Sequence, residues 1–389
     1  MQIIYVNYGT YKMSSGVHIH FLGNELTKMG HDVTSVIPYI EDNEHFGHPN
    51  YEIIDYITFG KYIAEGKYSE NTIVHGWTPR ENVRQVVKLA ADTLKCKYFV
   101  HLEDNERRLL EAMFKQPFKQ ICMLASRGEI NVPEAMSHPL LHQTFIAEAN
   151  GVSILMDKLG EFVPNDVPTQ LIWPACEEEF YKLPVNRNMK LRETFKIPEN
   201  ATVIVYPGNV HYANADIVAP LYRALPLIEQ KGHPIHLVRC AGSDHGFIPK
   251  DIYEIIEKYI TAFPMSQPSQ LPAFLRIADI LVQPGSENTF DDYRFPSKLP
   301  LFLASGRPVI LAKTNIGRFL EDEINCRILK ENTPENIAEL VIELIENKDK
   351  AAKIGNGGRE FAKEHFNWIK SATRLVKFYQ TCPQKPQES

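Results

Sequence analysis

Residues 278–310 read ADILVQPGSENTFDDYRFPSKLPLFLASGRPVI and decide the fold of this chain. The apolar runs at 279–283 and 308–312 predict two buried parallel strands. Between them we expect a loop that carries Arg294 and Lys298, and then a helix closed by a glycine. Amide groups and the dipole at a helix start favour anions. The stretch therefore predicts a phosphate site at Arg294 and Lys298.

Strand and helix signals alternate along both halves of the chain. Helical periodicity falls between short β-rich runs, and its clearest example is 16–29, which ends at Gly30. This alternation predicts an α/β protein with parallel sheets and right-handed crossovers. The expected strands are 2–7, 32–37, 71–75, 97–101, 151–155 and 169–172 in the first half, and 203–208, 235–239, 279–283, 308–312 and 326–329 in the second.

Length and composition are those of an ordinary two-domain protein. The 389 residues exceed the usual size of a single core, and 44% apolar with 23% charged residues fits neither a disordered nor a membrane-spanning chain. A net charge of -6 argues against a nucleic-acid partner. Six separated cysteines without a CxxC pair predict reduced thiols. Since the first residues form a strand rather than a secretory signal, we expect a cytoplasmic protein.

The stretch 278–310 resembles the donor-binding half of GT-B glycosyltransferases of the retaining family-4 type, the glycosyl transferases group 1. The first third of the chain supports the same resemblance. Ser15-Gly16-Val17-His18-Ile19-His20 and Gly30-His31-Asp32-Val33-Thr34 are similar to the opening motifs of these families, in the same order.

The resemblance implies two Rossmann-like domains that face each other across a cleft. We expect an acceptor domain at 1–173 and a nucleotide-sugar donor domain at 174–365, with a proline-bearing crossover near Pro174. In the resembled fold the last helix, here 366–381, crosses back to the first domain. The tail 382–389 carries two prolines and little to bury, so we expect it to be disordered.

The implied activity is transfer of a sugar from a nucleotide-diphosphate sugar to an acceptor hydroxyl, with retention at the anomeric carbon. The acceptor would be a glycan, a lipid-linked molecule or a small molecule. No cofactor or metal is expected, because protein cations and amides can compensate the diphosphate charge. Two alternatives stay open: a nucleotide-sugar epimerase or hydrolase on the same fold, and a catalytically silent binding subunit.

Lys298 matches the Lys that precedes the equivalent helix in many relatives, and Arg294 can add a bidentate phosphate contact. The alternative is that both belong to a solvated loop. Four further residues could approach phosphate oxygens. Gly208 permits close backbone approach, Asn209 and His211 can donate hydrogen bonds, and Gly16 opens a helix after a loop.

The donor half departs from the family at two places. Tyr293 and Leu301 occupy the positions of two family glutamates, and the Arg and Lys that commonly follow Gly208 are absent. Glu287 is the nearest acid on the loop, and it is either a hydroxyl-binding group or an exposed loop residue. These departures motivate the silent-subunit alternative.

On the first domain, the end of the strand at 97–101 carries the best catalytic candidates. His101 matches a family His that lies near the transferred sugar, and Glu103 or Asp104 could orient an acceptor hydroxyl or act as a base. One of the two acids could instead cap the next helix.

Another strand end predicts acceptor contacts. His75 and Arg80 could contact hydroxyls or charge, and Trp77 could stack on a sugar face. The alternative is a buried Trp with a structural His. His18 and His20 lie two residues apart near a helix start, so their side chains should diverge and not share a zinc ion.

Aromatic and basic residues alternate over 113–119. This pattern could give weak peripheral contact with an anionic membrane surface, although it is also typical of an ordinary amphipathic surface.

Overall fold

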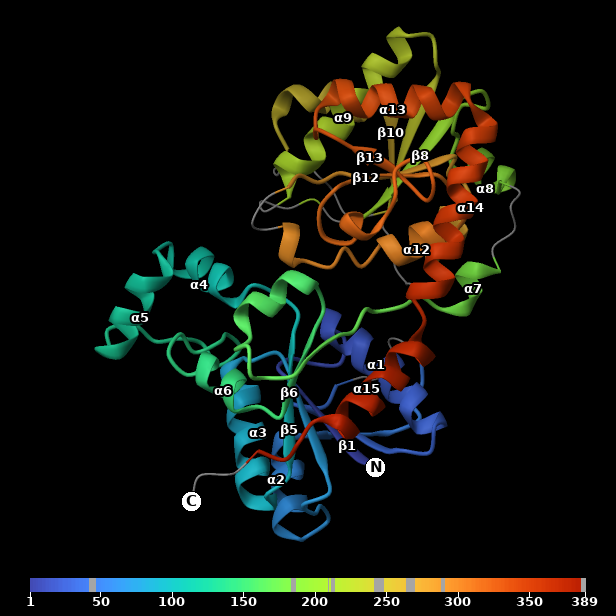
Figure 1. The fold of residues 1–389 in the computed structure, drawn as a ribbon. Helices are drawn as coiled ribbons and strands as arrows, with labels where there is room; N and C mark the ends of the chain where they lie inside the picture. The colour runs from blue at the N-terminus through green and yellow to red at the C-terminus, as the bar shows by residue number, and fades with distance from the viewer. Residues whose placement is uncertain are drawn as a thin grey trace. The chain divides into compact units, whose positions relative to one another are not determined.

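The computed structural model describes residues 1–41, 47–182, 187–208, 210, 214–240, 248–263, 270–287 and 291–385. These residues form two compact units. Unit 1 comprises Met1–Pro174, Tyr293–Phe295 and Trp368–Ser389, and unit 2 comprises Ala175–Asp292 and Pro296–Asn367. Each unit is a parallel sheet covered by helices (Figure 1).

The described strands of unit 1 form a sheet in the order β3-β2-β1-β4-β5-β6-β7, and every pair is parallel. Because strand order reverses between β1 and β4, the carboxyl ends of these strands mark the usual ligand position of an open α/β sheet. The strands are β1 (Gln2–Asn7), β2 (Asp32–Ile37), β3 (Glu52–Asp55), β4 (Ile73–Trp77), β5 (Lys97–Leu102), β6 (Gly151–Ile154) and β7 (Thr169–Leu171).

The helices of unit 1 follow its strands in the alternation that the sequence predicts. They are α1 (Ser14–Lys28), α2 (Tyr56–Ala64), α3 (Glu81–Leu94), α4 (Glu106–Phe114), α5 (Phe118–Ser126), α6 (His142–Glu148), the 3-10 turn η1 (Asp157–Phe162) and α15 (Trp368–Thr381).

The C-terminal helix α15 packs on the sheet of unit 1 beside α1 (Figure 1). The rings of Phe21 and Trp368 stack at 5.2 Å, and Ser371 donates to the carbonyl of Trp173 at 2.9 Å. The chain beyond α15 also packs here, because Cys382 is buried and Lys97 donates to its carbonyl at 2.6 Å. The predicted disorder therefore does not describe 382–385, and 386–389 lie outside the described residues.

Unit 2 repeats the plan with the strand order β10-β9-β8-β11-β12-β13, again parallel at every described pair. Its order reverses between β8 and β11. The strands are β8 (Thr202–Pro207), β9 (Ile235–Cys240), β10 (Ile260–Phe263), β11 (Ile280–Gln283), β12 (Val309–Ala312) and β13 (Arg327–Leu329).

Helices α9 and α13 pack together over the second sheet (Figure 1). The core beneath them includes Ile204, Tyr222, Leu237 and Val341, all buried. The described helices of unit 2 are α7 (Glu178–Tyr181), α8 (Met189–Thr194), α9 (Ala215–Gln230), α10 (Tyr253–Tyr259), α11 (Leu271–Leu275), α12 (Leu299–Ala304), α13 (Pro334–Glu346) and α14 (Lys348–His365), with 3-10 turns η2 (Lys250–Ile252), η4 (Asp291–Tyr293) and η5 (Asn315–Phe319).

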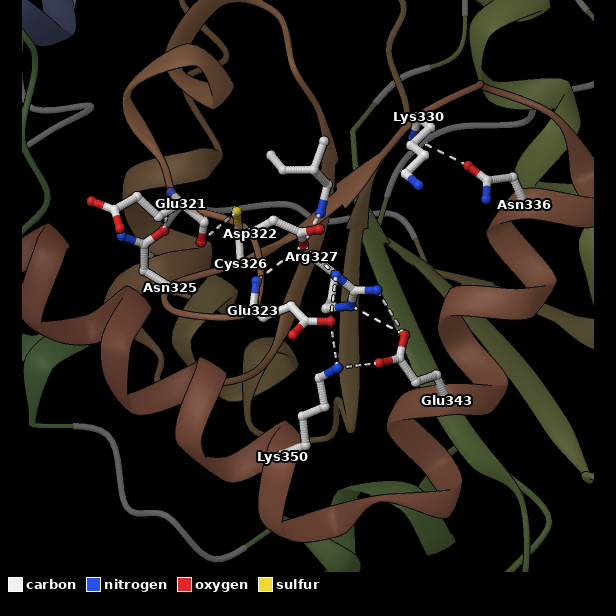
Figure 2. Close-up of polar contacts among 11 residues, drawn as sticks. Glu321, Asp322, Glu323, Asn325, Cys326, Arg327, Lys330, Asn336, Glu343 and Lys350 are labelled. Carbon is white, nitrogen blue, oxygen red and sulfur yellow. Dashed lines mark hydrogen bonds and ion pairs between the residues drawn. The ribbon is translucent and has the colours of Figure 1, made fainter.

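A charge network ties the edge strand β13 to two helices (Figure 2). Arg327 on β13 donates to Asp322 and, at 2.8 Å, to Glu343 of α13. Lys350 of α14 contacts Glu343 at 2.5 Å and Glu323 at 2.6 Å. Since the opposite charges pair with each other, this network stabilises the edge of the sheet and does not point to a ligand.

At Gly355, helix α14 lies too close to the backbone of Gly306 for a side chain to fit. A Cβ there would lie 2.2 Å from the carbonyl oxygen of Gly306. We expect Gly355→Ala to lower the free energy of unfolding by about 1–3 kcal/mol, because backbone atoms must separate to make room. Gly60→Ala, in α2, is the matched control: nothing lies within 4 Å of its Cβ, and we expect stabilisation of about 0.5–1 kcal/mol. Denaturant unfolding checks both signs, and equal stability of Gly355→Ala and wild type would contradict the packing argument.

Candidate functional site

Polar side chains gather on one face of the unit 1 sheet because of its register. Trp77 on β4 pairs with His101 on β5, and His101 pairs with Ser153 on β6. Paired residues of neighbouring strands point to the same face, so all three lie together near the carboxyl ends of their strands. Glu103 comes two residues after His101 and directly after β5.

Glu103 accepts hydrogen bonds from several residues of this cluster. Its carboxylate accepts hydrogen bonds from Ser15 Oγ at 2.5 Å, His18 Nδ1 at 3.1 Å and Trp77 Nε1 at 2.7 Å. Burial raises the pKa of Glu103, but the hydrogen bond and charge of His18 oppose it, and the pKa falls to about 2. Glu103 is therefore a fixed anion at neutral pH.

His101 presents an unused ring nitrogen. It is 1% exposed, its Nδ1 lies 2.6 Å from Ser153 Oγ, and its ring stacks on Trp77 with centroids 4.1 Å apart. Its Nε2 has no hydrogen-bond partner among the residues that the structure describes. Burial lowers the pKa of His101 to about 3, so the imidazole is neutral. A neutral ring with a buried, unpaired nitrogen is ready to bond a ligand.

Ligand atoms of His18, His101 and Glu103 lie within 4.8 Å of one another, a grouping that could hold a metal ion. Glu103 already accepts three hydrogen bonds, one of them from His18, and a metal would have to displace them. We therefore interpret the group as a hydrogen-bond cluster. The expectation that no metal is required stays a prediction.

Asp104 and Glu106 lie beside Arg80. The guanidinium of Arg80 stacks on the ring of Tyr8 at 3.7 Å, and its Nε is 3.8 Å from Glu106 Oε1. Burial, together with the Glu103 charge, raises the pKa of Asp104. Burial raises the pKa of Glu106 to about 7, despite Arg80. No motif of the sequence singled out Glu106.

The raised pKa of Glu106 predicts a pH-dependent effect of Glu106→Gln on stability. The folded carboxyl holds its proton up to about pH 7, whereas the ordinary value is 4.5, so wild-type stability falls as pH rises between these values. Gln does not titrate and can still accept the hydrogen bond from Ser137, which is 2.8 Å long in the wild type. We expect the melting temperature of Glu106→Gln to match wild type near pH 4, to exceed it increasingly up to pH 7, and then to keep a constant lead. A difference that does not change with pH would contradict the raised pKa.

The acceptor-binding role predicted for two residues is corrected, because both side chains are buried. His75 is fully buried, and its ring nitrogens bond to Tyr379 at 2.7 Å and Ser153 at 3.0 Å. Trp77 is 1% exposed, bonded to Glu103 and stacked on His101. Neither ring is open to a sugar, so both support the cluster instead.

The donor-binding role predicted for Gly16 is also corrected. Its amide donates to the carbonyl of Met13 at 2.9 Å, so it is not free for a ligand. A Cβ at this position would lie 2.0 Å from the carbonyl oxygen of Tyr11. Glycine is needed here because the loop before α1 folds against the first turn of the helix.

Unit 2 brings Gly208 and Lys298 together at the carboxyl end of β8. A Cβ on Gly208 would lie 2.4 Å from Lys298 Nζ, and Gly208 has φ +151, which also favours glycine. The same ammonium lies 5.1 Å from the centroid of the Tyr206 ring. Strand order reverses at β8, so this cation stands where open α/β sheets bind ligands.

The helix start predicted at Arg294 and Lys298 differs from the structure. Helix α12 begins at Leu299, has six residues, and has Lys298 as its N-cap. The phosphate role predicted for Lys298 therefore depends on its ammonium and on Gly208, not on a helix dipole, and it stays a prediction. Arg294 is exposed and groups with unit 1, so its partnership with Lys298 stays a prediction.

The structure gives little support to the other residues predicted to bind the donor, Glu287, Asn209 and His211. Glu287 is exposed, as its loop alternative requires. Asn209 and His211 lie outside the described residues.

Arg239 is the residue of this site that sequence reasoning missed. It is fully buried on β9, paired in register with Tyr206, and donates to Tyr222 OH and to the carbonyl of Gly208, both at 2.6 Å. Its guanidinium lies 4.8 Å from the Tyr206 ring centroid. Arg239 thus fixes the backbone against which Lys298 lies. An arginine inside the apolar run of β9 was the available signal, because a buried charge must have partners.

The segment predicted to contact a membrane lies on α4 and α5. Met113 and Met123 are 47% and 45% exposed, and Lys115 and Lys119 are exposed beside them. Membrane contact stays a prediction. Among the described residues, no helix has the length and apolarity needed to cross a bilayer.

Solved structures with the same architecture cover nearly the whole chain. A glycosyltransferase from Rickettsia africae superimposes with a TM-score of 0.72 at 13% identity, over 97% of this chain and 98% of that one. Anabaena HepE in complex with UDP-glucose gives 0.69 at 12% identity, over 98% and 100%. The fold is GT-B. The predicted fold class is therefore confirmed.

Sequence comparisons agree with this fold. Residues 201–347 match the family model described as Glycosyl transferases group 1, which confirms the predicted resemblance. The uncharacterized glycosyltransferase MJ1178 of Methanocaldococcus jannaschii is 23% identical over 220 residues, 53% of this chain and 58% of that protein. D-inositol 3-phosphate glycosyltransferase of Corynebacterium glutamicum is 20% identical over 267 residues, 65% and 62% of the two lengths. The alignments thus span about three fifths of these two curated relatives.

Proposed function

We propose that this GT-B protein transfers a sugar from a nucleoside-diphosphate sugar to an acceptor hydroxyl. The observation that carries the proposal is Lys298 lying directly on Gly208 at the reversal point of the unit 2 sheet. This unit contains the match to glycosyl transferases group 1, and HepE, a protein of the same fold, binds UDP-glucose.

The chemistry that such a site must supply is charge compensation. When the bond from the sugar to the diphosphate breaks, negative charge grows on the leaving oxygen, and a fixed cation stabilises it most. Lys298 supplies that cation, and the missing side chain of Gly208 leaves room for its ammonium against the end of β8. On this basis we also propose that transfer proceeds without a metal ion.

Unit 1 supplies the polar groups proposed to act on the sugar and the acceptor. Neutral His101 offers Nε2 to a hydroxyl, and the Glu103 anion can stabilise positive charge that develops on the sugar ring. Retention at the anomeric carbon is proposed from the resemblance to family-4 enzymes.

Two alternatives predict different outcomes in one set of experiments. An epimerase or hydrolase on this fold would interconvert or release the sugar without an acceptor. A silent binding subunit, suggested by Tyr293 and Leu301 at the family glutamate positions, would bind the nucleotide without turnover.

Thermal-shift screening with UDP, GDP, TDP and CMP compounds and their sugars is the first test, because a ligand of the folded state raises the melting temperature. The donor that stabilises best is then incubated with candidate acceptors, with and without EDTA. Acceptor-dependent nucleotide release with an α-linked product from an α-linked donor, unchanged by EDTA, is expected. If no nucleotide stabilises the protein, or sugar is released equally without acceptor, the transferase proposal fails.

A further inference from the structure

A line of hydrogen bonds runs from His101 through the interior of unit 1. His101 Nδ1 lies 2.6 Å from Ser153 Oγ, and Ser153 Oγ lies 3.0 Å from His75 Nε2. His75 Nδ1 lies 2.7 Å from the hydroxyl of Tyr379, which donates to the hydroxyl of Tyr5 at 3.4 Å. The line thus joins β5, β6, β4, α15 and β1.

All five members are buried. Their side chains belong to residues that are at most 1% exposed. Burial lowers the pKa of His75 and of His101, so each imidazole is neutral and carries one proton. Burial also raises the pKa of Tyr379, which keeps the phenol protonated.

One proton per member gives the line a direction. Since Tyr379 donates its own proton to Tyr5, its oxygen accepts from His75, and the His75 proton is on Nδ1. His75 Nε2 must then accept from the Ser153 hydroxyl. The Ser153 oxygen in turn accepts from His101, whose proton is on Nδ1. His101 Nε2 therefore carries no proton, and its lone pair can accept a hydrogen bond.

We propose that Tyr379, His75 and Ser153 are positioning residues that hold His101 in the tautomer protonated on Nδ1. The C-terminal helix α15, through Tyr379, thereby decides which hydrogen-bonding role His101 offers to a ligand. In this tautomer Nε2 accepts a hydrogen bond from a substrate hydroxyl and cannot donate one. The catalytic consequence rests on the proposed glycosyl transfer, whereas the tautomer itself does not.

The tautomer can be measured on the ligand-free full chain. Labelling with ¹⁵N-histidine and long-range ¹H–¹⁵N correlation spectra show which ring nitrogen carries the proton. Loss of a signal in His101→Gln assigns His101 among the 14 histidines. In wild type we expect His101 protonated on Nδ1.

Tyr379→Phe should reverse the direction of the hydrogen bonds between His75, Ser153 and His101. His75 loses the acceptor for its Nδ1 proton, so it is expected to move that proton to Nε2 and donate to Ser153, which then donates to His101 Nδ1. His101 should become protonated on Nε2, and turnover with the best donor should fall about tenfold, the size of one lost hydrogen bond. The matched control is Tyr98→Phe, which removes another buried phenol of unit 1, one that donates to the Phe145 carbonyl at 3.0 Å. It should leave the His101 signal unchanged.

An unchanged His101 signal in folded Tyr379→Phe overturns the proposal, and so does a wild-type His101 protonated on Nε2. If Tyr379→Phe does not fold, Ser153→Ala provides the same test, since it cuts the line next to His101. Retention of the single Nδ1 tautomer in that variant also overturns the proposal. A tautomer that responds as expected in a protein without transferase activity would refute the proposed function and leave this inference standing.

Discussion

Replacing Lys298 with alanine should weaken nucleotide binding about tenfold to a hundredfold. The ammonium lies against Gly208 at the carboxyl end of β8, where a diphosphate would be bound. A hydrogen bond to a charged group contributes about 1.5–3 kcal/mol, which corresponds to this range of affinity. Calorimetry with the nucleotide chosen by thermal shift measures the change directly.

Lys231→Ala is the matched control for this experiment. Lys231 is an exposed lysine of the same unit, but it stands between the end of α9 and the start of β9, at the opposite edge of the sheet. Its removal should leave the dissociation constant unchanged. Equal affinity of Lys298→Ala and Lys231→Ala would remove Lys298 from the donor site.

The strands were predictable because most of them are buried on both faces. β1 and β2 occupy the predicted ranges, and β8, with five of its six residues buried, lies within one residue of its prediction. β3 and β10 were missed. Both are four-residue edge strands with largely half-exposed side chains, so neither shows the apolar run by which buried strands are found.

The candidate site was predictable only as separate pieces. Gly208 was predicted because a glycine permits close backbone approach, and Lys298 was predicted from the expected helix start and the family resemblance. Their direct contact across 90 positions of the sequence could not be predicted. The helix α12 was predicted, but it begins later than expected, at Leu299, because Pro296 to Lys298 form part of a turn.

The hydrogen-bond partners of the buried polar residues were the main feature that the sequence did not predict. His18 and Ser15 bond to Glu103 across more than 80 residues, and Tyr379 bonds to His75 across 304. The sequence does carry one signal for such groups, which is a polar residue within an apolar strand, as for Ser153 on β6. Such a residue must find a partner, but its identity depends on which elements pack together.

His101→Ala should lower turnover about a hundredfold, the smaller end of the range for a group that exchanges or orients a proton. The change removes the buried ring nitrogen Nε2, which has no hydrogen-bond partner among the described residues, while Glu103 keeps its bonds to Ser15 and Trp77. The binding of the nucleotide alone should be unaffected, because Lys298 belongs to unit 2. Initial rates at saturating donor measure turnover, and calorimetry measures nucleotide binding.

The matched control is His236→Ala. His236 is also a buried strand histidine bonded to a hydroxyl, that of Thr261 at 2.8 Å, but it stands at the amino end of β9 in unit 2. Both variants lose a similar side chain and a similar hydrogen bond, so their stabilities should fall by comparable amounts. Only His101→Ala should lose turnover, because only His101 lies at the carboxyl end of its strand, where open α/β sheets bind ligands. If turnover falls equally in the two variants, the loss reflects destabilisation, and His101 has no direct part in the reaction.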